Sequence, residues 1–103
     1  PGAEARAVEA PALAILRDAG LGDGFKMRFG YGVGAGYPPT WLDPFQITRT
    51  STEALRPGIA FVLHACLLDA SAGAGVVVGG TYAMGEDGLE QLAGAGPIDL
   101  VTT

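Results

Sequence analysis

The sequence predicts an α+β domain in which one N-terminal helix precedes a curved, mainly antiparallel sheet. Apolar residues recur at helical spacing over residues 3–19, and the rest of the chain alternates short apolar runs with glycine- and proline-rich turns. A chain of 103 residues with 49% hydrophobic content suffices for one domain, which we expect to span residues 1–103. We expect three to five strands with one or two helices on one face of the sheet.

The N-terminal helix is predicted over residues 3–19 and should end where Gly20 can adopt the left-handed cap conformation. Pro11 interrupts this segment, because proline removes a helical hydrogen bond and clashes with the preceding turn. A kink at Pro11 and a fresh helix start there are both compatible with the sequence. Its apolar face comprises Val8, Ala12, Ile15, Leu16 and Ala19.

Glycine occupies every second position over residues 30–36, which predicts an extended strand with one face free of side chains. Such a face permits close approach by a ligand or by another backbone. No window in this segment matches G-x-G-x-x-G, and the ending of a P-loop is absent, so a phosphate-binding loop is not predicted.

A loop rich in large rings should follow the turn at Pro38 and Pro39. Trp41 and Phe45 in this loop either form one wall of a pocket or fill the core of a domain that has few bulky residues. The sequence leaves both interpretations open.

The sequence pattern of the second half of the chain predicts the central strands of the sheet. Residues 59–68 form an apolar run after a turn at Pro57 and Gly58, which is typical of a buried strand. Two further strand sections are expected at residues 76–78 and 81–84, separated by a glycine break.

Charge and cysteine content exclude several classes of function. The chain has 6 Lys and Arg against 11 Asp and Glu, a net charge of −5, with no basic cluster, so neither nucleic acid nor an anionic membrane is an expected partner. Residues 70–85, the longest uncharged stretch, are shorter than the about 20 residues of a membrane span. Cys66 is the single cysteine, so it cannot form an internal disulfide. The first residues show no signal-peptide pattern, and we therefore expect a cytoplasmic protein.

Four segments resemble, in their order, the C-terminal half of the creatinase/aminopeptidase P/prolidase family, whose fold is called pita-bread. They read DAGLGD, RFGYGVGAGYPPTWLD, LRPGIAFVL and GVVVGGTYAMGEDGLEQL, and the resemblance covers about residues 5–92. GYPPTW is most similar to the branch that contains ectoine hydrolases and related metal-independent members. The resemblance implies that this chain forms half of a pita-bread domain.

The resemblance also implies that three metal-ligand positions have changed. Metallopeptidases of this family hold two metal ions with two aspartates from the first half of the domain and a histidine and two glutamates from the second. By this pattern Tyr31 replaces the histidine, His64 the first glutamate and Gly79 the last glutamate. A lone imidazole cannot assemble an oxygen-rich two-metal site, so we expect no metal, no cofactor and no metallopeptidase activity.

Creatinase and ectoine hydrolase break C–N bonds without metal, so the resemblance implies an enzyme acting on a small cyclic amidine, amide or amino-acid derivative. His64 would be the general acid and base, because an imidazole exchanges protons near neutral pH. Tyr31 would donate a hydrogen bond to a developing negative charge. Arg28 would pair with a substrate carboxylate. The substrate would be walled by Tyr37 and Trp41.

Each of these residues also has an ordinary structural interpretation. His64 can be a satisfied core histidine and Tyr31 an aromatic at the edge of the core. Cys66 shares a strand face with His64, which permits a Cys–His nucleophile, but a free cysteine is commonly a small buried hydrophobe. The alternative function is therefore a degenerate, non-catalytic domain that serves small-molecule binding or the assembly of a complex.

Half of a pita-bread domain would leave one sheet face and one edge uncovered, which soluble proteins avoid. We therefore expect this chain to pair with a companion chain that supplies the N-terminal half, or with a second copy of itself as a homo-oligomer.

Overall fold

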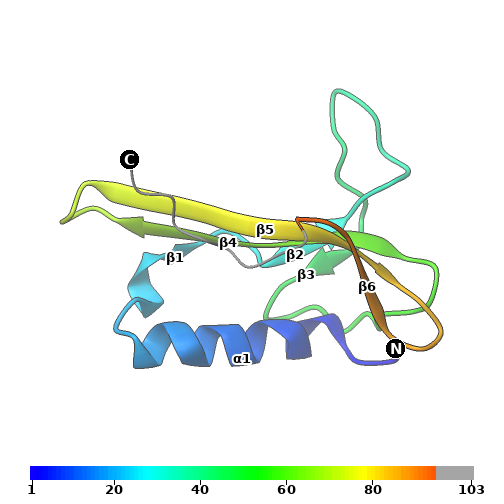
Figure 1. Cartoon of the computed structure of the whole chain (residues 1–103), viewed down its shortest axis with the longest axis horizontal. Helices are drawn as coiled ribbons and strands as arrows, with labels where there is room; N and C mark the ends of the chain where they lie inside the picture. The colour runs from blue at the N-terminus through cyan, green and yellow to red at the C-terminus, as the bar shows by residue number, and fades with distance from the viewer. Residues whose placement is uncertain (95–103) are drawn as a thin grey trace.

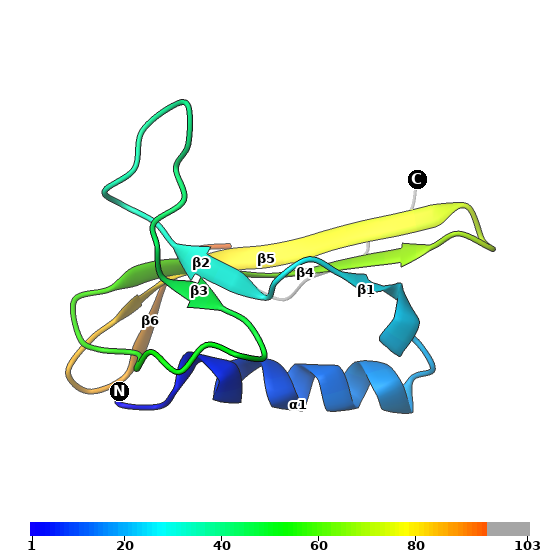
Figure 2. The same ribbon diagram turned by 180° about the vertical axis from the view of Figure 1, so that it is seen from behind.

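The computed structural model describes residues 1–94 and places one helix along one face of a sheet (Figure 1). Figure 2, the view from behind, shows that the loop between β2 and β3 rises from the side of the sheet opposite to the helix. The predicted α+β class is confirmed. The elements are α1 (Ala5–Asp18), the short 3-10 turn η1 (Gly22–Gly24), β1 (Phe25–Lys26), β2 (Gly30–Gly32), β3 (Gln46–Ile47), β4 (Ala60–Asp69), β5 (Ala74–Met84) and β6 (Leu89–Ala93).

The sheet is antiparallel throughout, with the order β3-β2-β4-β5-β6, and β1 also pairs with β4. It contains six strands where three to five were predicted. The difference arises because residues 25–26 and 46–47 pair with strands that lie far from them in sequence. Segments of two residues carry no periodic pattern, so the sequence could not reveal them.

The predicted break between two strand sections is wrong, since β5 runs continuously from Ala74 to Met84. Gly79 pairs with His64 and Gly80 with Leu63, so the ladder to β4 continues through both glycines. Pairing with a long neighbouring strand overrides the low intrinsic strand preference of glycine.

The predicted strand over residues 30–36 is also wrong beyond Gly32, where β2 ends. Gly34 has a φ of 128°, a conformation that turns the chain out of the sheet. Close approach by another backbone is confirmed at Gly30, where an added Cβ would lie 2.2 Å from the Val62 carbonyl oxygen.

The helix α1 is continuous through Pro11, so a fresh start at that residue is wrong. Pro11 is exposed, and its ring therefore does not disturb the packing against the sheet. The helix ends as predicted: Gly20 has a φ of 73°, and the Leu21 N–H donates to the Leu16 carbonyl over 2.7 Å. Within residues 1–94 no helix has the length and apolar character needed to cross a membrane.

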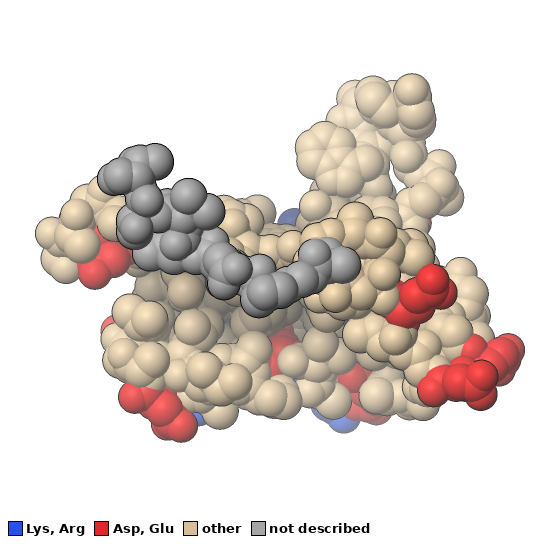
Figure 3. Space-filling model, in the orientation of Figure 1, with Lys and Arg blue, Asp and Glu red and all other residues tan. Residues whose placement is uncertain are grey.

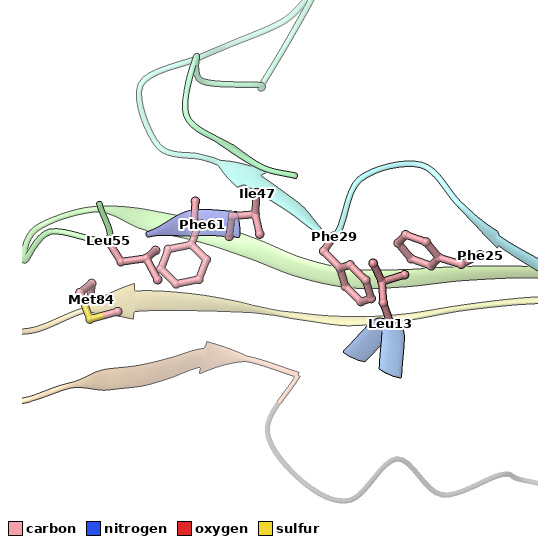
Figure 4. Packing of buried hydrophobic residues seen from close by; sticks show 8 residues of the cluster. Leu13, Phe25, Phe29, Ile47, Leu55, Phe61 and Met84 are labelled. Carbon is pink, nitrogen blue, oxygen red and sulfur yellow. The ribbon is translucent and has the colours of Figure 1, made fainter. Parts of the chain in front are cut away.

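The core lies between α1 and the sheet (Figure 4). Phe61 on β4 is 1% exposed and stacks on Tyr82, with Phe45 tilted against it at 6.3 Å between ring centroids. Phe45 therefore helps to fill the core, whereas Trp41 is 58% exposed and does not. The buried side chains of this cluster are Ala5, Leu13, Phe25, Phe29, Ile47, Leu55, Phe61 and Met84.

The turn between β4 and β5 is held by the side chain of Asp69. Its Oδ1 accepts hydrogen bonds from the Ser71 hydroxyl at 2.6 Å, the Ser71 N–H at 2.9 Å and the Ala72 N–H at 3.1 Å. The Ser71 hydroxyl, followed by the Ala72 N–H, lowers the pKa of the Asp69 carboxyl below its ordinary value. These bonds favour the ionised carboxylate and weaken as pH falls through the lowered pKa.

Replacing Ser71 with alanine is expected to raise the pKa of Asp69 toward the ordinary value of an aspartate, because the main donor to the carboxylate is lost. A titration that follows the Asp69 side-chain carbon by NMR measures this shift. An unchanged midpoint would show that the backbone N–H groups alone maintain the lowered pKa.

Candidate functional site

Tyr31 and His64 lie side by side on the face of the sheet that points away from α1. Tyr31 pairs with Val62 in the register of β2 and β4, and His64 follows Val62 by two residues, so all three project to the same side. The opposite side of β4 carries Phe61 and Leu63, which pack in the core. The two rings meet edge to face with 5.6 Å between their centroids, so the two predicted catalytic residues are adjacent.

Trp41 reaches this pair from the loop between β2 and β3, which rises above the same face (Figure 1). Its indole Nε1–H donates to the Tyr31 hydroxyl oxygen over 3.4 Å. Residues 33–42 of the loop carry no charged side chain. In Figure 3 the projecting loop is free of acidic and basic side chains, while acidic groups are scattered over the rest of the molecule. An apolar, ring-bearing loop therefore borders the Tyr31–His64 pair.

The His64 imidazole forms no hydrogen bond within residues 1–94. Its Nδ1 is buried and has no hydrogen-bond partner within residues 1–94. The backbone of the same residue is fixed, because the His64 N–H donates to the Phe29 carbonyl over 2.8 Å. This nitrogen keeps an unused hydrogen-bonding capacity, and a ligand would reach it only after the side chains around it shift.

Arg28 is joined to the site through a residue that the sequence analysis missed. Its Nη1 donates to the Gln46 Oε1, and Gln46 lies directly opposite Tyr31 in the pairing of β2 with β3. The Gln46 Nε2 donates to the Asp43 carbonyl over 3.1 Å. Gln46 belongs to a two-residue strand, where no pattern in the sequence could single it out.

Tyr37 is the one predicted site residue that these contacts do not join to the others. It is 87% exposed, and its side chain forms no hydrogen bond within residues 1–94. Its role in enclosing a substrate stays a prediction.

Cys66 is buried on the same face of β4 as His64, opposite Lys26 on β1 and Val77 on β5. Since only 9% of it is exposed, its burial favours the interpretation as a small hydrophobe over that of a nucleophile.

The three positions at which the sequence suggested lost metal ligands lie on adjacent strands. Tyr31 is on β2, His64 on β4, and Gly79 on β5 is the register partner of His64. Gly79 has no side chain, and an added Cβ would lie 2.6 Å from the Leu63 carbonyl oxygen. Within residues 1–94 no group of three His, Cys, Asp or Glu residues could hold a metal ion. The described residues therefore do not fit the two-metal centre of the metallopeptidases in the family that the sequence resembles.

Comparison with known proteins supports the fold. No protein-family model matches the sequence, and no curated protein matches it. Among solved structures, the chain is similar to a prolidase from Pyrococcus furiosus, with a TM-score of 0.81 and 24% identity over 94% of this chain and 27% of that one. It is also similar to the dipeptidase PepE from Mycobacterium ulcerans, with a TM-score of 0.81 and 25% identity over 93% of this chain and 24% of that one. An Xaa-Pro dipeptidase from Bacillus anthracis gives a TM-score of 0.81 and 21% identity over 97% of this chain and 26% of that one.

The prediction of half a pita-bread domain is thus confirmed, because the solved neighbours that share this architecture are prolidases and dipeptidases. The chain spans about a quarter of the length of these proteins.

Proposed function

We propose that this chain is part of a pita-bread enzyme that cleaves a C–N bond in a small molecule, with His64 and Tyr31 as its proton-transferring and charge-stabilising groups. The observation that carries the proposal is the edge-to-face contact of these two rings on the face of the sheet that points away from α1, with the Nδ1 of His64 left without a partner in residues 1–94. The similarity to prolidases and dipeptidases supports a hydrolytic reaction.

The neighbouring groups give each residue a defined role. The imidazole of His64 takes a proton from the attacking water and returns it to the leaving nitrogen. Trp41 donates to the oxygen of the Tyr31 hydroxyl, which leaves the proton of that hydroxyl free to point elsewhere. Tyr31 then donates it to the carbonyl oxygen on which negative charge develops.

We propose that the reaction proceeds without metal ions at the Tyr31, His64 and Gly79 positions, as in the ectoine-hydrolase-like branch that GYPPTW resembles. The donor set at these positions supports this, because imidazole is the only metal ligand among them and oxygen-rich two-metal sites need several carboxylates. The expected substrates are small cyclic amidines, amides or amino-acid derivatives.

We further propose that a companion polypeptide, or a second copy of the chain, covers the exposed face and completes the site. This chain accounts for about a quarter of the length of its structural neighbours, and Val77 on β5, which shares the face of Tyr31 and His64, is 66% exposed. The free thiol of Cys66 agrees with a reducing location such as the cytoplasm.

Metal dependence tests the proposal. The protein, purified with any chain that accompanies it, is treated with EDTA and assayed on N-acyl amino acids, dipeptides and cyclic amides, with and without added Mn²⁺ or Zn²⁺. We expect turnover that neither the chelator nor the added ion changes. Turnover that appears only with added metal would contradict the metal-independent mechanism.

The alternative is a non-catalytic domain that binds small molecules or assembles a complex. It is favoured by one observation: within residues 1–94 no carboxylate bonds to the His64 ring. No acidic side chain of these residues therefore orients the imidazole for repeated proton transfer. Absence of turnover on every substrate, with the companion chain present, would support this alternative.

A further inference from the structure

An apolar groove lies between α1 and β5, on the face of the sheet that packs against the helix. It has a volume of about 400 Å³, and no Asp, Glu, Lys or Arg among residues 1–94 lines it. Its apolar walls are formed by Val8, Ala12, Phe29, Leu63, Ala65 and Val78. Uncharged, concave surface of this kind is suited to an apolar segment that needs to leave water. We call it the α1–β5 groove.

The chain itself leads to this groove. Gly94, the last described residue, is one of the residues that line it. Gly94 has a φ of 79°, which turns the backbone out of β6, and the Gln91 Nε2 fixes this turn by donating to the Gly94 carbonyl over 2.8 Å. A Cβ added at Gly94 would lie 3.0 Å from the Gly79 carbonyl oxygen, so the turn packs directly on β5. The chain therefore leaves β6 at the groove.

The sequence that follows Gly94 has the pattern of a segment that buries one side. Residues 95–103 lie outside the described part of the chain and read AGPIDLVTT. Four of the five residues at positions 97–101 are apolar, and Asp99 is the charged one. In an extended chain Ile98 and Leu100 point to one side and Asp99 to the other. Such a segment can bury two large aliphatic side chains and keep its carboxylate in water.

Its place in the chain favours this segment over a separate polypeptide as the occupant of the groove. Two residues separate Gly94 from Pro97, and they span at most about 7 Å. A segment on so short a tether has an effective concentration of about the millimolar range or more, which a free partner must exceed. The companion chain proposed above covers the other face of the sheet, so it does not compete for the groove.

We propose that residues 97–101 bind in the α1–β5 groove as an extended segment. The side chains of Ile98 and Leu100 insert between α1 and β5, and Asp99 faces solvent. The segment adds large aliphatic side chains to a domain that has few of them in its core, and so stabilises the packing of α1 on the sheet. This inference goes beyond the proposed catalytic function and does not depend on it.

A spin label placed just beyond the segment tests where it binds. A nitroxide is attached at Thr102→Cys in the full chain, with Cys66→Ala to remove the natural thiol, and methyl NMR spectra are recorded with the label oxidised and reduced, with any companion chain present. We expect the oxidised label to broaden the methyl signals of Val8 and Val78, which line the groove. The signal of Ala35, on the loop that rises from the other side of the sheet, should stay sharp.

Two neighbouring substitutions of the same kind supply the matched comparison. Leu100→Asn should remove the broadening and raise the equilibrium constant for unfolding in urea by at least about 10-fold, as expected when a buried leucine is lost. Val101→Asn changes the side that faces away from the groove and should keep both close to the parent protein. Equal effects of the two variants would overturn the inference. Broadening at Val8 and Val78 no stronger than at Ala35, the result if another polypeptide occupies the groove, would overturn it as well.

Discussion

Replacing His64 with alanine is expected to lower kcat by about 10²- to 10⁴-fold, the range typical of a lost general acid–base. The physical reason is that an imidazole can both take and give a proton, and the His64 Nδ1 has no hydrogen-bond partner within residues 1–94. Steady-state kinetics on a substrate identified in the chelator assay measure the effect. Tyr31→Phe should keep the ring contact with His64 and lower kcat through loss of the hydroxyl alone.

Cys66→Ala is the matched control for His64→Ala, because it changes a buried side chain on the same face of the same strand. It should leave kcat close to that of the natural protein. Loss of activity in Cys66→Ala would support the thiol of Cys66 as a nucleophile. Full activity in His64→Ala would contradict a catalytic role of the imidazole.

Replacing Gly30 with alanine is expected to destabilise the domain by about 3 kcal/mol or more, at the upper end of overpacking effects. A Cβ at this position would lie 2.2 Å from the Val62 carbonyl oxygen and 3.1 Å from the Ile47 side chain. The first of these neighbours is backbone in the central strand β4, so it cannot rotate away, and β2 must move from its place beside β4. Urea unfolding followed by circular dichroism measures the loss.

Gly22→Ala serves as the comparison for Gly30→Ala. The tightest contact of its added Cβ is with the flexible Arg17 side chain at 3.2 Å, which can shift at little cost. We expect its midpoint of unfolding to stay close to that of the natural protein. Equal stability of the two variants would mean that β2 tolerates displacement from β4.

Part of the candidate site could be predicted from the sequence. His64 and Tyr31 were singled out together, and the pairing of β2 with β4 places their rings 5.6 Å apart. The contact of Trp41 with Tyr31 agrees with its predicted place at the site. Gln46 was missed, because its importance comes from its partners: it contacts an arginine 18 positions away in sequence and lies opposite Tyr31.

The elements whose signal is local could be predicted from the sequence alone. The helix α1 follows from its three- and four-residue spacing and its glycine end, and β4 follows from an apolar run after a turn. Three features follow from long-range contacts instead: β5 continues through Gly79 and Gly80, residues 25–26 and 46–47 are strands, and Arg28 lies beside Gln46. The reason is that strand pairing and side-chain contacts join residues distant in sequence, so they depend on a register that no single segment encodes.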